Sequence, residues 1–303
     1  MQERSFTWRH RTHQGDETTR DGGLFWSGIV EPMEDDFYKI PIYEHASVNE
    51  FSPTDEIAAH RIHWEGGVIH CAAAIRDHPV LTVGYHGAVA KQRLPLYERL
   101  ASRRESPESF LLFADPTLDL STELNIGWCI GHADSDPTDT FLAIVRKVAD
   151  ACGSNDVQFT GSSAGGFAAL QHSIRWPGST AIVFAPQTDV SKYYASHYGR
   201  LIQHAFPGLT GEEAHEKYLE RFSAVHTYAT MPRHNKVRYV MNQGDDHHLN
   251  VHCKNFAEVF GLEPSGGVSE DGTIEIVPID MGEGHKYPKP EVFEPQLNAV
   301  TKR

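Results

Sequence analysis

Cysteine is scarce in this sequence, and long apolar runs are absent. Four cysteines stand in 303 residues, far apart and without a CxxC spacing, so we interpret them as free thiols and not as a disulfide or metal framework. No apolar run approaches the roughly 18 residues that a membrane-spanning helix needs, and the polar start, "MQERSFTWRHRTHQGD", shows no targeting signal. We therefore expect a cytoplasmic protein without a membrane partner. The cysteines are Cys71, Cys129, Cys152 and Cys253.

Positive charge is also in short supply. Lysine and arginine total 27 against 41 acidic residues, which gives a net charge of -14 at pH 7. A surface of this sign repels the phosphates of nucleic acids and of anionic lipids. The composition therefore argues against a nucleic-acid partner and leaves the oligomeric state open.

Histidine, by contrast, is plentiful, with 19 copies. His60 and His63 fall in a predicted strand, where a spacing of three sends their side chains to opposite faces. The cluster His247, His248 and His252 has no cysteine or carboxylate framework at metal-ligand spacing. We therefore predict no metal site.

The first 75 residues differ in kind from the rest. "FYKIPIY" alternates apolar and polar residues, and "HRIHWEGGVIHCAAAI" predicts two strands that join in a hairpin at Gly66 and Gly67. We predict a β-rich accessory segment over residues 1–75. The alternative is that these are the first antiparallel strands of the main sheet.

Residues 76–303 alternate short apolar runs with helical patterns, which is typical of a mainly parallel sheet with crossover helices. One helix is predicted from an N-cap at Asp136 to a stop at Gly153. The predicted strands are "VLTVGYHG", "SFLLFAD", "LNIGWCIG", "VQFTG", "AIVFAP", "VRYVMNQ" and "IEIVPI".

About fifty residues separate "AIVFAP" from "VRYVMNQ", more than a crossover needs. Within them, Thr210 and Glu213 have the spacing of a capping box, so helices are expected. We interpret residues 190–235 as a helical lid over a pocket. The alternative is that the aromatic residues of this insertion pack it onto the body of the protein.

The stretch Gly161-Ser162-Ser163-Ala164-Gly165 matches G-x-S-x-G and stands between a predicted strand and a predicted helix. Such a sharp turn leaves no room for Cβ atoms at the flanking positions, which are glycines here. Ser163 occupies the serine position, where its hydroxyl projects above the end of the strand. The N–H of Ala164 then faces a developing oxyanion.

A general base and an orienting acid can follow in the order Ser, acid, His. His285 lies in the loop after the last predicted strand, where it can take the proton from Ser163. Asp245 follows the strand "VRYVMNQ" and is our first choice for the acid that orients the imidazole; Asp246 and Asp189 are the alternatives.

The oxyanion hole needs a second N–H besides that of Ala164. The predicted strand "LTVGY" ends at His86, and the next two residues lie where the loop after the third strand of such sheets runs. We predict that the backbone N–H of Gly87 or Ala88 supplies the second donor.

The motifs "GYHGA", "GSSAGG", "NQGDD" and "GEGHK" resemble those of the α/β-hydrolase superfamily. "GSSAGGFAAL" with the following Asp-Asp pair is similar to the catalytic domains of prolyl-oligopeptidase-like hydrolases and esterases, although the chain is too short for their β-propeller. "FADPTL" and "APQTDV" resemble bacterial hydrolase-like proteins associated with surface polysaccharide genes. The resemblance implies an α/β-hydrolase fold, a triad of Ser163, Asp245 and His285, and no metal or organic cofactor.

Three functions fit this pattern. The first is a serine hydrolase that cleaves a carboxylic ester through an acyl-enzyme. The second is an acyltransferase in which a glycan hydroxyl replaces water, since both reactions share their first half. The third is a binding protein that has kept the fold and lost the activity. The expected partner is therefore a small-molecule or glycan ester.

Overall fold

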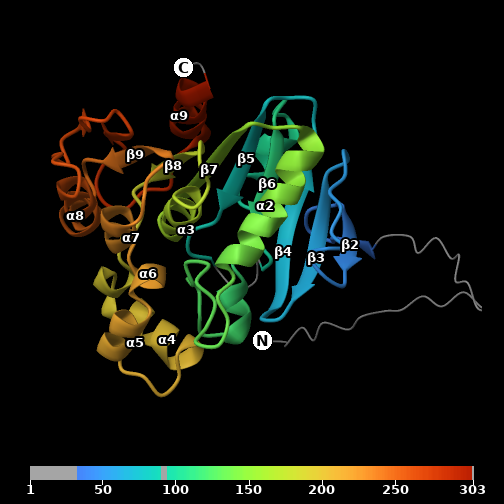
Figure 1. Ribbon diagram of the computed structural model, residues 1–303, viewed down its shortest axis with the longest axis horizontal. Coiled ribbons are helices and arrows are strands. Elements are labelled where there is room, and N and C mark those ends of the chain that lie inside the picture. Colours follow the sequence, from blue (N-terminus) through green and yellow to red (C-terminus); the bar gives the residue numbers. More distant parts are fainter. Residues whose placement is uncertain (1–32, 90–93, 302–303) are drawn as a thin grey trace, which may run out of the picture. The chain divides into compact units, whose positions relative to one another are not determined.

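The structure is a computed structural model that describes residues 33–89 and 94–301 (Figure 1). In this part of the chain, eleven strands form one sheet in the order β1-β2-β3-β4-β6-β5-β7-β8-β9-β11-β10. The strands are β1 (Met33–Glu34), β2 (Pro41–His45), β3 (Ala58–Trp64), β4 (Gly67–Ala74), β5 (Val80–Tyr85), β6 (Ser109–Phe113), β7 (Asp156–Ser162), β8 (Thr180–Phe184), β9 (Lys236–Asn242), β10 (Gly267–Val268) and β11 (Ile274–Ile279).

The middle of the sheet is parallel. Strands β6, β5, β7, β8, β9 and β11 pair in parallel with one another in succession. Antiparallel pairs join β3, β4 and β6 on one side and β11 and β10 on the other. All parallel strands point their carboxyl ends to one edge, which brings the loops after β5, β7, β8, β9 and β11 together.

Helices cover both faces of the sheet, which explains why its central strands are apolar throughout. In β6, Leu111 and Phe113 pack in the larger core cluster, whereas Phe110 and Leu112 pack in a second cluster on the other face. The helix α2 (Thr138–Cys152) crosses the first face and α3 (Ala164–Ser173) lies beside it (Figure 1). The second face is covered by α1 (Leu100–Arg104) and α9 (Pro290–Thr301). The predicted fold class is confirmed.

The strands of the predicted N-terminal segment belong to this same sheet. β3 and β4 form the expected hairpin, with Trp64 opposite Gly67, and β4 pairs with β6 of the main body. The main sheet therefore does not begin at residue 76. The pairing agrees with the alternative interpretation, in which these strands are the first strands of the main sheet. Residues 1–32 of the predicted segment lie outside the described residues.

Helix α2 ends at Gly153 as predicted, and it begins one residue later than predicted, with Pro137 and not Asp136 as its N-cap. The Thr138 N–H donates to Asp136 Oδ1 at 3.0 Å, which satisfies one of the free N–H groups of the first turn. At the other end, Gly153 takes a left-handed conformation with φ of 63°. Local capping residues thus define this helix.

The insertion between β8 and β9 is helical, as expected. It comprises α4 (Ala195–Ala205), α5 (Gly211–Lys217), α6 (Leu219–Phe222) and α7 (Ala224–Thr230). The capping box of α5 is present, with reciprocal hydrogen bonds between Thr210 and Glu213. Phe206 and Phe222 are fully buried in the core cluster and hold the insertion on the body. A lid function for the insertion stays a prediction.

One predicted strand is wrong. The run "LNIGWCIG", residues 124–131, forms turns, and both Trp128 and Cys129 have positive φ values of 55° and 57°. Ile126, Trp128 and Ile130 are nevertheless buried in the core cluster. The apolar run reflected burial, which a turn beneath an insertion can require as well as a strand.

After β9, residues His248–Cys253 form a π-helical turn that continues into α8 (Lys254–Glu258). Short π-helical segments are frequent at functional sites. No helix in the described ranges combines the length and the apolar character needed to cross a membrane.

Candidate active site

Ser163 stands on the sharp turn between β7 and α3. Its backbone has φ of 56° and ψ of -120°, a conformation that most residues avoid. A Cβ atom at Gly161 would lie 2.3 Å from the carbonyl carbon of Gly165, and a Cβ at Gly165 would lie 2.2 Å from the Tyr85 carbonyl oxygen. Both glycines are therefore required by close backbone contact, as the G-x-S-x-G pattern predicts.

The loop after β5 lies against this turn. A Cβ added at Gly87 would lie 3.7 Å from the Cβ of Ser163. The Gly87 N–H, however, donates to the Glu98 carboxylate at 3.0 Å and is therefore already bound. Ala88, the other predicted donor, is exposed next to it. Ala164 is the first residue of α3, so its N–H has no carbonyl of a preceding helical turn to bind.

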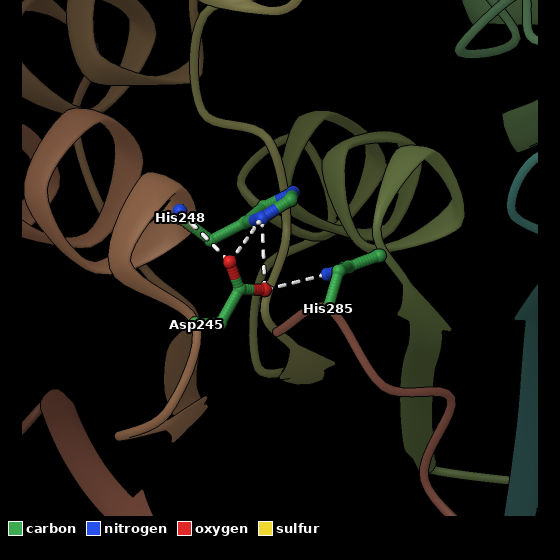
Figure 2. Close-up of side chains that lie close together, drawn as sticks. All are labelled: Asp245, His248 and His285. Carbon is green, nitrogen blue, oxygen red and sulfur yellow. Dashed lines mark hydrogen bonds and ion pairs between the residues drawn. The ribbon is translucent and has the colours of Figure 1, made fainter. Parts of the chain in front are cut away.

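Asp245 lies between two histidines (Figure 2). Its Oδ2 accepts a hydrogen bond from Nδ1 of His285 at 2.7 Å, and Nδ1 of His248 lies 2.9 Å from the same oxygen. The backbone N–H of His248 donates to Oδ1 at 3.2 Å. Asp245 is 3% exposed, whereas the side chain of His285 is 35% exposed. The predicted acid and the predicted base are thus in contact.

These contacts shift the pKa values of Asp245 and His248. Burial by itself would raise the pKa of Asp245, but the hydrogen bonds from His248 and His285 outweigh it and hold that pKa well below its ordinary value. Burial lowers the pKa of His248, against the opposing effect of Asp245. Asp245 is therefore ionised at neutral pH, and His248 is neutral.

The loop that carries His285 is fastened to the end of β9. Asn242, fully buried, donates from Nδ2 to the carbonyls of Gly282 and Gly284, both at 2.9 Å, and accepts from the Met281 N–H at 2.8 Å. The Gly284 N–H donates to the Gly244 carbonyl at 2.7 Å. The acid loop and the histidine loop are thereby held together independently of Asp245.

The two alternative acids lie elsewhere. Asp246 is exposed, which agrees with the expectation that neighbouring residues point in opposite directions. Asp189 caps a short 3-10 turn by accepting from Ser191, and its other oxygen pairs with His215 of α5 at 3.1 Å. Asp189 therefore links the insertion to the sheet and does not contact His285.

The Ser163 hydroxyl contacts Gln187, a residue outside the G-x-S-x-G motif. Gln187, in the loop after β8, donates from Nε2 to Ser163 Oγ at 2.7 Å, and the same nitrogen lies 2.7 Å from His248 Nε2. Within the described ranges no hydrogen bond joins Ser163 to His285. The structure therefore brings Asp245 to His285 and leaves the last contact of the predicted triad unmade.

Asp245, His248 and His285 offer three ligand atoms within 4.8 Å of one another, which invites a metal interpretation. The two imidazole rings, however, stack with centroids 4.0 Å apart and planes inclined by only 14°. An imidazole nitrogen binds a metal through a lone pair in its ring plane, and two nearly parallel stacked rings cannot direct both lone pairs at one ion. The arrangement fits two N–H donors to one carboxylate better.

Three residues of this site were not among the predicted site residues: Gln187, His248, and Trp128, whose indole Nε1–H donates to Gln187 Oε1 at 3.1 Å. Gln187 stands in "APQTDV" directly after a strand whose carboxyl end faces Ser163, and that position was a usable signal. His248 lies three residues after Asp245, within the histidine cluster to which we assigned no metal site. Nothing in the sequence pointed to Trp128, which lies in the segment predicted to be a strand.

Strand order, helix placement and the serine turn together are those of an α/β-hydrolase fold, and solved structures agree. The chain is similar to a capsule O-acetyltransferase of Neisseria meningitidis serogroup A, with 15% identity and a TM-score of 0.58 over 80% of this chain and 92% of that one. A variant of that acetyltransferase has been solved in complex with CoA.

Two further structures share the fold. One is the Glycosylation Associate Protein (Gap123) complex from Streptococcus agalactiae, with 13% identity, a TM-score of 0.58, and coverage of 80% of this chain and 46% of that one. The other is a puromycin hydrolase, with 16% identity, a TM-score of 0.51, and coverage of 81% and 38%. No protein-family model and no curated protein sequence matches the chain.

Proposed function

We propose that this protein is a serine-dependent acyl-transfer enzyme with Ser163 as nucleophile, His285 as general base and Asp245 as the acid that orients it. The observation that carries the proposal is the 2.7 Å hydrogen bond between Asp245 and His285 at the sheet edge where Ser163 occupies its strained turn. An imidazole whose Nδ1–H is bound to a buried carboxylate presents Nε2 as the proton acceptor.

The first half-reaction forms an acyl-enzyme. Ser163 Oγ attacks the acyl carbon of the donor, His285 Nε2 takes the hydroxyl proton, and the N–H groups of Ala164 and Ala88 bind the oxyanion. When the tetrahedral intermediate collapses, the bond to the leaving group breaks and His285 gives it the proton. Asp245, still ionised, stabilises the imidazolium between these steps.

The second half-reaction transfers the acyl group to an acceptor hydroxyl, whose proton passes to His285 and then to Ser163 Oγ. Our first candidate for the acceptor is a glycan hydroxyl. The fold shared with a capsule O-acetyltransferase and the sequence resemblance to proteins of surface polysaccharide genes support it. They favour transfer over the ester hydrolysis that was our leading expectation from sequence.

The second candidate is hydrolysis of a carboxylic ester, with water as acceptor. It is supported by the exposed third of the His285 side chain, which water can reach, and by the fold shared with a puromycin hydrolase. The two reactions differ only in what occupies the acceptor position when the acyl-enzyme breaks down.

The nucleophile is tested by labelling the protein with a fluorophosphonate probe. Ser163→Ala should abolish labelling, because the probe reacts with an activated serine hydroxyl. Ser162→Ala is the matched control: Ser162 is the adjacent, equally buried serine at the end of β7, and its variant should still be labelled. Labelling that persists in Ser163→Ala would overturn the proposal, and an unlabelled wild type would favour the binding protein.

The acceptor is tested with p-nitrophenyl acetate and acetyl-CoA as alternative donors. Each is incubated with the wild type, with and without an oligosaccharide, and the products are separated by mass. A mass gain of one acetyl group on the oligosaccharide supports transfer. Free acetate alone, formed at the same rate with and without the sugar, supports the hydrolase.

A further inference from the structure

The orientation of the Gln187 amide is determined by its neighbours. The Trp128 indole Nε1–H, which can only donate, lies 3.1 Å from Gln187 Oε1. The amide oxygen therefore faces the indole, and the amide NH₂ faces the opposite way. Gln187 is fully buried, so no water competes for either end.

Both hydrogens of that NH₂ have a partner at short distance. Ser163 Oγ and His248 Nε2 each lie 2.7 Å from Gln187 Nε2. An amide nitrogen does not accept hydrogen bonds, so both contacts are donations from Gln187. Ser163 Oγ accepts on one lone pair and keeps its own hydrogen to give away.

The hydrogen-bond donors and acceptors around His248 also determine its tautomer. Because His248 Nε2 accepts from Gln187, it carries no proton, and the single proton of the neutral ring is on Nδ1. That proton faces the Asp245 carboxylate, whose Oδ2 lies 2.9 Å from His248 Nδ1. Each polar group from Trp128 through Gln187 and His248 to Asp245 therefore has a hydrogen-bond partner. With its Nε2 lone pair in use, His248 cannot take the proton of Ser163. The base is therefore the other histidine on Asp245, His285.

The three segments that carry Trp128, Ser163 and Gln187 each contain a residue other than glycine with positive φ. Among the described residues, six that are not glycine have positive φ, and four of them are Trp128, Cys129, Ser163 and Ala185. They lie in three separate segments: the turn that carries the indole, the turn that carries the nucleophile, and the start of the loop that carries Gln187. Such strained conformations persist only where the surrounding structure enforces them.

We infer that Gln187 is a further catalytic residue of the proposed acyl-transfer site, held by Trp128 so that its amide donates to the nucleophilic oxygen and to His248. When Ser163 loses its proton to His285, negative charge develops on Oγ, and the donated hydrogen bond strengthens. The same bond stabilises Oγ as it leaves the acyl carbon in the second half-reaction. This inference rests on the proposed function, since it requires Ser163 to be the nucleophile.

The test measures the second-order rate constant for fluorophosphonate labelling. Gln187→Leu keeps the size of the side chain and removes both donors, and it should slow labelling by about tenfold to a hundredfold, the usual effect of losing one charge-assisted hydrogen bond. Gln171→Leu is the matched control: Gln171 is a buried glutamine of α3 that donates to the Glu220 carbonyl and does not touch Ser163. It should label at the wild-type rate.

A second variant separates chemistry from packing. Gln187→Glu should fold, because it is isosteric, but its carboxylate accepts where the amide donates. Labelling should fall at neutral pH, because the carboxylate repels the charge that develops on Ser163 Oγ, and the pH profile should gain the ionisation of the new carboxyl. Gln187→Leu should show no such ionisation.

The outcomes distinguish the role of Gln187 from the proposed function of the site. If Ser163→Ala is still labelled, the proposed function fails. If Ser163→Ala is silent but Gln187→Leu and Gln187→Glu label at the wild-type rate and with the wild-type pH profile, the role of Gln187 is refuted and the proposed function stands.

Discussion

A single carboxylate organises the residues of the site. Asp245 accepts hydrogen bonds from two imidazoles and one backbone N–H, and each contact favours its ionised form. The second ring nitrogen of His248 lies against Gln187, whereas the His285 side chain is partly exposed. In the proposed mechanism, two chemically identical side chains on one acid therefore take different roles, because their second nitrogens have different surroundings.

Replacement of Asp245 should slow labelling far more than the same replacement of its neighbour Asp246. Asp245→Asn should lower the rate of labelling by roughly 10³ to 10⁴, because an amide NH₂ cannot accept the Nδ1–H of His285 and the wrong tautomer results. Asp246→Asn makes the same change at the next, exposed position and should label within about twofold of the wild type. An equal loss of labelling rate in both variants, measured with the same probe, would contradict the assignment of Asp245 as the acid.

At the scale of the element, the turn from β7 to α3 depends on the absence of Cβ atoms. The backbone of α3 lies against the end of β5 closely enough that Tyr85 and Gly165 are in direct contact. That close contact brings the N-terminus of α3, with its unpaired N–H of Ala164, beside the Gly87-Ala88 loop. The geometry of the proposed oxyanion site is therefore a consequence of how a helix packs on a strand.

Gly165→Ala should disrupt this packing. The added Cβ would lie 2.2 Å from the Tyr85 carbonyl oxygen, which is backbone and cannot move aside. We expect a loss of labelling of at least tenfold and a lower melting temperature. Gly199→Ala in α4 makes the same substitution where nothing lies within 4 Å of the new Cβ, and it should stabilise the protein by up to about 1 kcal/mol. Similar melting temperatures for both variants would contradict this explanation.

At the scale of the whole molecule, buried histidines determine how the protein responds to acid. His60 in β3, His172 in α3 and His252 after β9 are almost fully buried. Burial lowers the pKa of each to about 3. The folded state therefore holds these imidazoles neutral at a pH where the unfolded chain binds a proton to each.

A group whose pKa is lower in the folded state stabilises the fold above its unfolded pKa and loses that contribution as the pH falls. For these histidines the loss begins near pH 6.5 and continues toward pH 3. Between pH 7 and pH 5 the free energy of unfolding should decrease by on the order of 2 kcal/mol for each of the three. Urea unfolding at pH 7, 6 and 5 measures it.

His172→Phe isolates one contribution. The ring of His172 stacks on Tyr85 and packs on Phe141, so an aromatic replacement keeps these contacts without the titrating group. The variant should lose less stability than the wild type between pH 7 and pH 5. Parallel pH curves for the two proteins would show that His172 is not titrated on unfolding.

Much of the fold follows from local pattern. Apolar runs, the Gly66-Gly67 hairpin, the caps of α2 and α5, and the glycines around Ser163 all act within a few residues, so they are legible in the sequence. The error at residues 124–131 has the same origin, since a short apolar run reports burial and not backbone conformation. The positive φ values at Trp128 and Cys129 belong to a turn that the apolar run does not reveal.

Local patterns in the sequence were enough to predict the parallel strands in the middle of the sheet, the serine turn, and the chain order of Ser163, Asp245 and His285. The contacts of Gln187 with Ser163 and of His248 with Asp245, and the pairing of β4 with β6, became visible only in the folded chain. Local backbone preferences depend on neighbours in the chain, whereas contacts between side chains depend on how distant segments pack, and hydrogen-bond partners follow from that packing.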